Sequence, residues 1–150
     1  NPIEKQKLQL PELPASQSRV TLLRSSENVD YTQGVFILNE DWFGHNNSTI
    51  NFMTSSGDFA YRIFQTANPG KELGCTSQFG TIFGDNMFIT SKQPKDGGAS
   101  IEGGRLNVVD AKTMKVKAQF TDIGGGDGRA FLGVNDSVGY IGASNGIFFV

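Results

Sequence analysis

Residues 79–120 read FGTIFGDNMFITSKQPKDGGASIEGGRLNVVDAKTMKVKAQF, and this stretch holds one complete unit of the pattern that decides the fold. Four short runs in it are rich in Phe, Ile and Val and have the length of strands. They lie at 79–83, 87–90, 105–110 and 115–120. Turn-forming residues separate the first and last pairs, Gly-Asp-Asn at 84–86 and Ala-Lys-Thr at 111–113. The unit therefore predicts four antiparallel strands.

Parts of the same unit recur on both sides of it. The runs GVFILN, MFIT and VGYIG place Phe36, Phe88 and Tyr140 at a spacing of about 52 residues, which is in the range of repeat folds. Matching runs follow each of these at 49–54, 105–110 and 146–150, and another precedes the later two at 79–83 and 130–134. The alternating runs at 59–64 and 115–120 complete the pattern as half-buried strands.

These observations predict an all-β fold, a β-propeller made of four-stranded antiparallel blades. A β-sandwich with similar hairpins is the alternative, but it does not explain the recurring order of the matched pieces. Residues 31–150 supply about two and a half blades, whereas a closed propeller needs at least about four. The last pattern also stops in mid-blade. The chain is therefore expected to be a fragment of a larger propeller, or to be completed by a separate chain.

Residues 1–30 differ from the rest, since they contain Pro2, Pro11 and Pro14 and no glycine. We predict an extended leader or linker, in which RVTLL at 19–23 is a candidate first strand.

Composition narrows the classes of function. The formal net charge is -2 and the Lys and Arg residues are dispersed, which argues against a nucleic-acid partner. The single cysteine allows no internal disulfide. The chain has one His and one Cys, which are too few for a His-based zinc site and give almost no basis for a Cys–His dyad. We predict a protein that is not an enzyme and has no metal site and no cofactor of its own.

The lengths of the predicted connections point to one end of the molecule. If each blade runs from its inner to its outer strand, the short turns at 55–58, 84–86, 111–113 and 135–137 share one face. The long connections at 40–48, 65–77, 92–104 and 121–129 then share the other. Because loops on a rigid scaffold carry function more often than strands do, the long connections are expected to form a ligand face.

Seven residues of these connections are candidate ligand-binding residues: Trp42, Phe43, His45, Asn46, Lys92, Gln93 and Arg129. Trp42 and Phe43 are either stacking groups for a flat or sugar-like ligand or caps over the space between blades. His45 is either a ligand-binding group, axial to a metal centre for example, or a loop hydrogen-bonder. Asn46 reads polar ligand edges or forms a turn. Arg129, paired with Asp127, faces the ligand or anchors a neighbouring blade.

Two segments resemble known propellers. NVVDAKTMKV at 107–116 is similar to the outer hairpin of YncE/YVTN-type propellers. GVFILNEDWFGHNNSTINFM at 34–53 resembles the opening blade of surface lipoproteins of gut Bacteroidetes, where a strand runs into Asn-Glu and then Asn-Asn-Gly/Ser-Ser/Thr. Here these residues are Asn39 and Glu40 and then 46–49. Residues 126–147 fit the same family, and the similarity covers 35–150.

The resemblance implies a seven-bladed propeller that captures cobalamin (vitamin B12) at the outer-membrane surface and passes it to a TonB-dependent transporter. It implies an extracellular location, with membrane attachment only through a lipid anchor outside this chain. The alternative is a scaffold that binds a protein or a glycan at the cell surface. No binding residue is carried over from the family, so the seven candidates follow from loop position alone.

Overall fold

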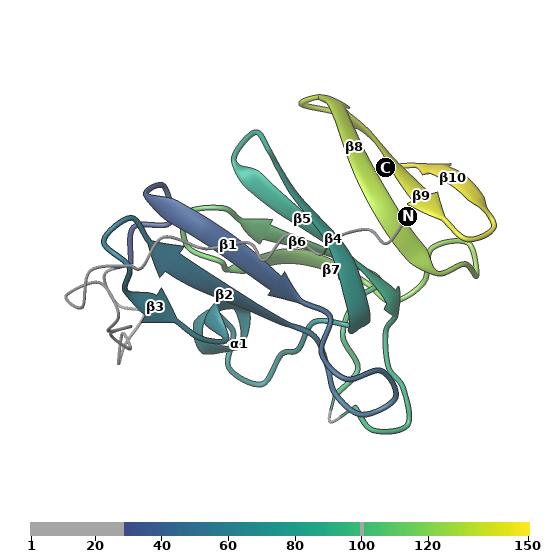
Figure 1. Ribbon diagram of the computed structural model, residues 1–150. Helices are drawn as coiled ribbons and strands as arrows, with labels where there is room; N and C mark the ends of the chain where they lie inside the picture. Colours follow the sequence, from purple (N-terminus) through teal and green to yellow (C-terminus); the bar gives the residue numbers. More distant parts are fainter. Residues whose placement is uncertain (1–28, 100) are drawn as a thin grey trace, which may run out of the picture.

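The computed structural model describes residues 29–99 and 101–150, and within them it has ten β-strands and one short α-helix (Figure 1). Apart from Val29 and Asp30, the predicted leader and its candidate strand at 19–23 lie outside the described residues. In chain order the elements are β1 (Gly34–Asn39), β2 (Thr49–Thr54), β3 (Phe59–Ala60), α1 (Ile63–Ala67), β4 (Cys75–Phe83), β5 (Asn86–Gln93), β6 (Leu106–Asp110), β7 (Val116–Phe120), β8 (Gly128–Asn135), β9 (Val138–Ala143) and β10 (Gly146–Phe149).

The strands form three antiparallel sheets. The first has the order β1-β2-β3, the second β4-β5-β6-β7 and the third β10-β9-β8. The helix α1 has only five residues. In the part of the chain that the structure describes, no helix has the length and apolar character needed to cross a membrane. The prediction of an all-β fold built from antiparallel sheets is confirmed.

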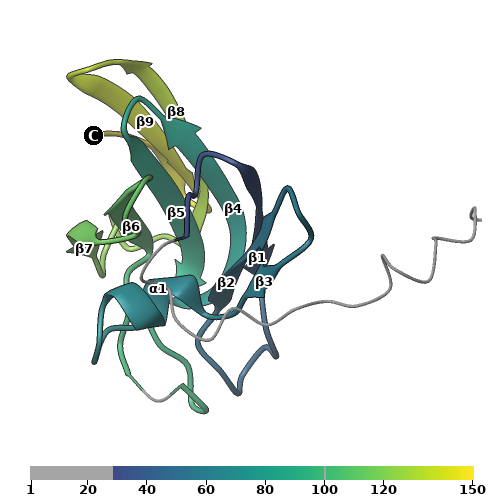
Figure 2. The same ribbon diagram turned by 90° about the vertical axis from the view of Figure 1, so that its left-hand side faces the viewer.

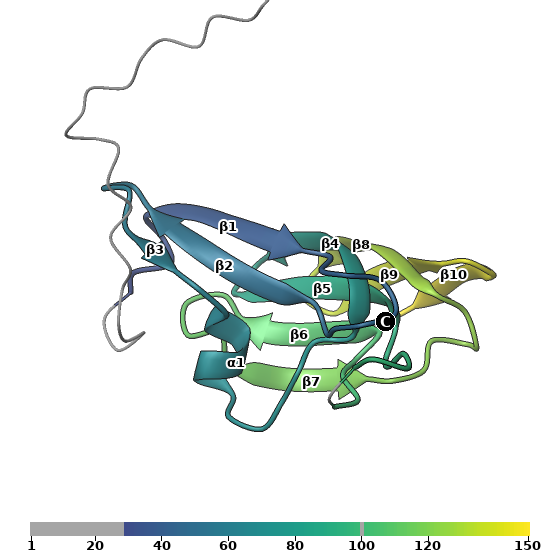
Figure 3. The same ribbon diagram turned by 60° about the horizontal axis from the view of Figure 1, so that its bottom comes forward.

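The three sheets follow one another in chain order, from left to right in Figure 1. β1 of the first sheet contacts β4 of the second, and β5 of the second contacts β8 of the third. Figure 2 looks along this series from the side of the first sheet. The helix α1 lies beside β2 and packs toward the outer strands of the second sheet (Figure 3).

The registers show that the pieces matched in sequence occupy equivalent places. The residue pairs that face each other across the matched strands are Phe36 with Phe52, Phe88 with Val108, and Tyr140 with Phe149. Thus β1, β5 and β9 are equivalent, and so are β2, β6 and β10. β4 and β8 are the strands that precede them. The first sheet contains counterparts of the last three strands of the second sheet, and the third sheet contains counterparts of its first three.

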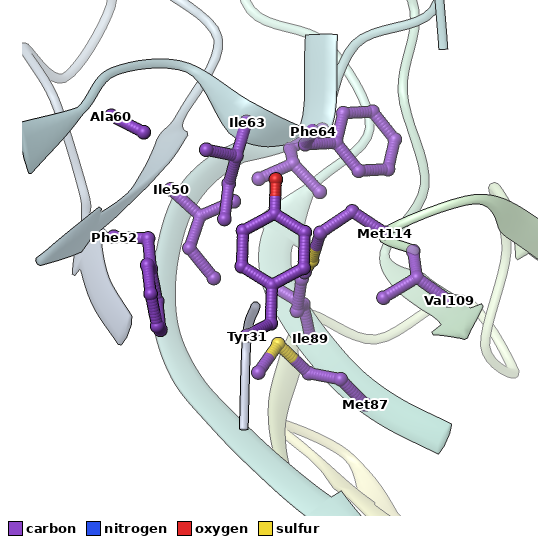
Figure 4. Close-up of a cluster of buried hydrophobic side chains, with 11 residues drawn as sticks. Tyr31, Ile50, Phe52, Ala60, Ile63, Phe64, Met87, Ile89, Val109 and Met114 are labelled. Carbon is purple, nitrogen blue, oxygen red and sulfur yellow. The ribbon is translucent and has the colours of Figure 1, made fainter. Parts of the chain in front are cut away.

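A cluster of buried hydrophobic side chains joins the first sheet, α1 and the second sheet (Figure 4). Phe52 and Phe64 are fully buried, and Tyr31 packs edge-on against Phe52 with ring centroids 5.0 Å apart. Burial of a side chain of this size contributes about 1.5–3 kcal/mol. The remaining members are Ile50, Ala60, Ile63, Leu73, Met87, Ile89, Val109 and Met114.

A second cluster joins the second and third sheets. Leu106, Val108, Ile123 and Ile141 are buried in it. At its side Phe88 of β5 stacks on Phe131 of β8, with centroids 3.8 Å apart and planes at 7°. Each pair of successive sheets thus shares its own hydrophobic interface.

The predicted strand at 59–64 is confirmed only at Phe59 and Ala60 and is wrong beyond them. β3 ends at Ala60, Arg62 has a left-handed backbone conformation with φ of 51°, and α1 begins at Ile63. The reason is that Ile63 and Phe64 are adjacent and both buried. A strand would point them to opposite faces, whereas neighbouring positions of a helix can both turn toward one core. Packing therefore overrides the alternating pattern.

The long connections are shorter than predicted. β4 begins at Cys75, β5 continues to Gln93 and β8 begins at Gly128, so each strand takes residues from a predicted connection. Lys92, Gln93 and Arg129 accordingly lie in strands and not in loops, which corrects the prediction. Polar residues carry little strand signal of their own, and the ladder with a neighbouring strand decides their conformation.

Candidate functional site

Three of the long connections meet at one end of the sheets, where Figure 1 shows the β1–β2 and β5–β6 connections descending side by side. The backbone N–H of Gly44 donates to Asp96 Oδ2 at 2.9 Å. Asn47 Nδ2 donates to the carbonyl oxygens of Leu73 at 2.8 Å and Ile101 at 2.7 Å. Side-chain hydrogen bonds from the buried Asn47 therefore tie the β1–β2 connection to the other two.

The connections also approach each other closely at a glycine. A Cβ on Gly98 would lie 2.3 Å from His45 Cα and 2.5 Å from the Gly44 carbonyl oxygen. No side chain fits at such distances. Gly98 thus lets the β5–β6 connection lie directly against the backbone of the β1–β2 connection.

Three of the short turns lie together at a different place. The N–H of Ala111 donates to the carbonyl oxygen of Asp85 at 2.9 Å. The turns at 84–86 and 135–137 border one hollow of about 510 Å³ that also includes Lys117. These three short turns thus form a group separate from the three long connections, as the alternation of hairpins predicts.

Trp42 and His45 stack on each other in the β1–β2 connection. Their ring centroids are 3.6 Å apart with planes at 22°, and the N–H of His45 donates to the Trp42 carbonyl oxygen at 3.0 Å. The Trp42 residue is 68% exposed. A flat indole held by a tight turn and a stacked imidazole presents a fixed apolar surface to solvent.

Phe43 and Lys92 form a second exposed pair at this end. Lys92 Nζ lies 5.1 Å from the centroid of the Phe43 ring, within the range of a cation–π interaction, and Phe43 is 57% exposed. This contact joins the β1–β2 connection to β5. We refer to Trp42, Phe43, His45 and Lys92 as the aromatic ledge.

Asn46 belongs to a polar hollow of about 210 Å³ rather than to the ledge. Besides Asn46, the hollow is lined by Asp41, Asn47, Arg62, Glu72 and Gly98. Arg62 Nη2 lies 3.3 Å from Glu72 Oε1, and Asp41 Oδ2 accepts a hydrogen bond from Thr49 at 2.8 Å. The hollow thus combines two carboxylates, two amides and a guanidinium group.

The chain is similar to a known protein family over most of its length. Residues 33–150 match the model of a family described as a domain of unknown function, DUF5074. The chain belongs to the DUF5074 family. No curated protein matches the chain.

The DUF5074 region begins just before β1, so it contains all ten strands, the aromatic ledge and the polar hollow. The family description states no activity.

Two sequence candidates of the DUF5074 region have other recorded contacts. Gln93 lies opposite Cys75 in the β4–β5 ladder. Arg129 Nη2 lies 3.4 Å from Asp127 Oδ2, which confirms the predicted pairing of these two residues. The structure gives neither of these two described residues a part in the ring stacking or the cation–π contact of the aromatic ledge. It brings together Trp42, Phe43, His45 and Lys92, with Asn46 beside them in the hollow.

Sequence reasoning missed Asp41, Arg62 and Glu72 as members of the hollow. They come from the β1–β2 connection, the β3–α1 junction and the segment after α1. Arg62 has a positive φ at the start of α1, a conformation that its residue type does not indicate. Asp41 also has a positive φ, of 61°, and it precedes Trp42. An Asp beside an exposed aromatic residue was the one signal available.

The groups with shifted pKa values, among them Cys75 and Asp110, are not members of the aromatic ledge. Burial raises the pKa of the Cys75 thiol above its usual range, so the thiolate is disfavoured. At the β6–β7 turn, the backbone N–H groups of Lys112 and Thr113 hydrogen-bond to Asp110 and hold the pKa of its carboxyl below the usual range. In residues 29–99 and 101–150, no group of three or more His, Cys, Asp or Glu side chains is placed to hold a metal ion.

Proposed function

We propose that the three sheets are successive blades of a β-propeller that captures a small molecule on a cell surface. The support for the propeller comes from the exposure of residues at equivalent positions in the three sheets. Phe52 of the first sheet and Val108 of the second are 0% and 9% exposed, because each faces the following sheet. Their counterpart Phe149 in the third sheet is 69% exposed. The first and second sheets both use this face to pack on the sheet that follows. The equivalent face of the third sheet is therefore suited to pack on another sheet.

The position two residues earlier in each of these strands shows the same difference in exposure. Ile50 and Leu106 are both 2% exposed, and their counterpart Ile147 is 77% exposed. Leu132 and Tyr140 lie opposite each other next to Phe149 and are exposed as well. This large apolar face is best explained by a further blade that packs on it, as the third sheet packs on the second.

The observation that carries the binding proposal is the aromatic ledge on the end where the long connections meet. Trp42 and Phe43 are both more than half exposed, yet each is held by a ring contact or a cation. Ordered and exposed aromatic surface of this kind loses little conformational entropy when it binds a flat ligand.

A corrinoid is the ligand class that we propose. Its broad ring offers a flat surface for the indole of Trp42, and its rim of amide groups suits the cation of Lys92 and the amide of Asn46. The support comes from this match and from the resemblance of residues 34–53 to surface propellers that bind cobalamin. In this role the protein is extracellular and delivers its ligand to an outer-membrane TonB-dependent transporter.

Titration of the intact chain with cyanocobalamin tests the proposal. Trp42 is the only tryptophan, so its fluorescence reports directly on the ledge. We expect a saturable decrease in emission beyond the absorption effect measured with N-acetyltryptophanamide, together with a ligand-dependent rise in the unfolding midpoint. Absence of both effects at saturating cyanocobalamin rejects the corrinoid.

Replacement of Trp42 by Ala is expected to weaken cyanocobalamin binding by about tenfold or more, because loss of a stacked aromatic surface costs at least about 1.4 kcal/mol. Calorimetric titration measures the change. Phe149→Ala is the matched control, since Phe149 is an equally exposed aromatic residue away from the ledge, and its affinity should equal that of the wild type. If the Trp42 variant and the wild type bind cyanocobalamin with equal affinity, the aromatic ledge is not the binding site.

A further inference from the structure

We infer that the polar hollow beside the aromatic ledge is a second binding site, for a neutral, hydroxyl-rich ligand of monosaccharide size. The hollow is bordered by Asp41, Asn46, Arg62 and Glu72 and has a volume of about 210 Å³. This is about seven times the share of liquid volume that one water molecule takes. The inference goes beyond the corrinoid ledge and does not depend on it.

The charges around the hollow are mixed. The guanidinium of Arg62 lies 3.3 Å from Glu72 and neutralises it, the Asp41 carboxylate disfavours an anion, and the described residues place no group of three or more His, Cys, Asp or Glu side chains there for a metal ion. A hydroxyl group both donates and accepts hydrogen bonds. The hollow offers both kinds of partner, because the Asp41 carboxylate accepts, the Arg62 guanidinium donates and the Asn46 amide does both.

Several of these groups have hydrogen-bonding capacity left for a ligand. The recorded partner of the Asp41 carboxylate is Thr49, on Oδ2, which leaves Oδ1 available. The recorded side-chain bond of Arg62 is a long one of 3.3 Å to Glu72, and the Arg62 side chain is 54% exposed. Among the residues that the structure describes, the Asn46 side chain has no hydrogen-bond partner.

Glu72 has a different role from the other three groups. Its side chain is only 13% exposed, and it accepts hydrogen bonds from Arg62 at 3.3 Å and from Gln65 Nε2 at 2.7 Å. A largely buried carboxylate with two donors is fixed in place. We therefore assign Glu72 to positioning the guanidinium of Arg62, and Asp41, Asn46 and Arg62 to contacting the ligand.

The backbone around the hollow is held before any ligand arrives. Asp41 and Arg62 both have positive φ, of 61° and 51°, a conformation that costs energy in residues with a side chain. The N–H of Arg62 donates to Asn51 Oδ1 at 2.9 Å, which fixes the conformation of Arg62. Such strain is retained where the surrounding structure over-determines it, and two strained residues facing one polar hollow indicate a preorganised site.

The ledge supplies an apolar neighbour for a sugar ring. Trp42 follows Asp41 in the chain and His45 precedes Asn46, so the stacked Trp42–His45 pair adjoins the hollow. Sugar rings have one face of C–H groups that packs on aromatic surface while their hydroxyls hydrogen-bond at the edge. Hydroxyl binding in the hollow and C–H packing on the indole are therefore compatible in one ligand.

The test is a titration of the intact, isotope-labelled chain with glucose, galactose and mannose, followed by heteronuclear NMR and calorimetry. We expect saturable binding of at least one sugar, with shifts in the Asn46 side-chain amide and in the backbone amides of 41–47. Arg62→Asn should weaken that binding by about tenfold, since it removes the donors while Asn still tolerates the left-handed conformation.

Arg129→Asn is the matched control. Arg129 is an exposed arginine with a carboxylate partner at 3.4 Å, like Arg62, but it lies in β8 away from the hollow. Its variant should bind the sugar as the wild type does. The inference is overturned if none of the three sugars binds saturably, or if Arg62→Asn retains full affinity. Sugar binding without cyanocobalamin binding would reject only the corrinoid, and the reverse would reject only the sugar site.

Discussion

Replacement of Phe52 by Ala is expected to lower the free energy of unfolding by about 3–5 kcal/mol. Phe52 is fully buried between the first and second sheets. Its ring packs against the rings of Tyr31 and Phe36, with a centroid separation of 5.0 Å in both pairs. The substitution removes most of the side chain and leaves a cavity that β-strands tied by a hydrogen-bonded ladder cannot close. Urea unfolding, followed by circular dichroism, measures the loss as a fall in midpoint at unchanged slope.

Phe149→Ala is the control at the equivalent place of the third sheet. Because Phe149 is 69% exposed, its variant should unfold within about 0.5 kcal/mol of the wild type. The same substitution becomes costly in any form of the protein in which a further blade covers the third sheet. A small effect of Phe52→Ala, or a large effect of Phe149→Ala in the 150-residue chain, would contradict the assignment of equivalent places.

Most of the strands were predictable from sequence because two constraints agree in them. In β2 and β6 the side chains that face the following sheet are apolar and turn formers separate the strands, so local propensity and tertiary packing require the same conformation. The repeat added a second, independent signal. Phe36, Phe88 and Tyr140 lie on equivalent strands, as their equal spacing predicts.

The errors occur where packing and local pattern conflict. FAYRIF alternates well enough to predict a strand, but the core takes both Ile63 and Phe64, and the chain turns into α1 through the left-handed Arg62. That conformation depends on a tertiary hydrogen bond from the Arg62 N–H to Asn51. A single sequence holds no signal for such a contact.

The candidate site was predictable in part for a similar reason. Trp42, Phe43, His45 and Asn46 share one connection, so their grouping needs no knowledge of distant contacts. Lys92 reaches Phe43 from β5, and the polar hollow depends on segments separated by tens of residues. Loop length predicted which connections meet at one end of the molecule, whereas the partners of each residue depended on the fold.

Replacement of Asn47 by Ala is expected to have the largest effect at the end where the long connections meet, a loss of about 2–4 kcal/mol of unfolding free energy. Asn47 is 6% exposed, and its side chain donates to the carbonyl oxygens of Leu73 and Ile101. Alanine leaves those two carbonyls without this donor in a place that water reaches poorly, and each such group costs about 1–3 kcal/mol. Denaturant unfolding measures the loss.

The neighbouring Asn46 provides the control, because it is the same residue type one position away but is exposed and makes no side-chain hydrogen bond among the described residues. Asn46→Ala should therefore unfold within about 0.5 kcal/mol of the wild type while it weakens sugar binding. Asn47→Ala should in addition speed hydrogen exchange at the Ser48 amide, which donates to the Gly74 carbonyl oxygen at 2.9 Å. If Asn47→Ala is as stable as Asn46→Ala, the connections are held together by other contacts, and neither the ledge nor the hollow owes its shape to Asn47.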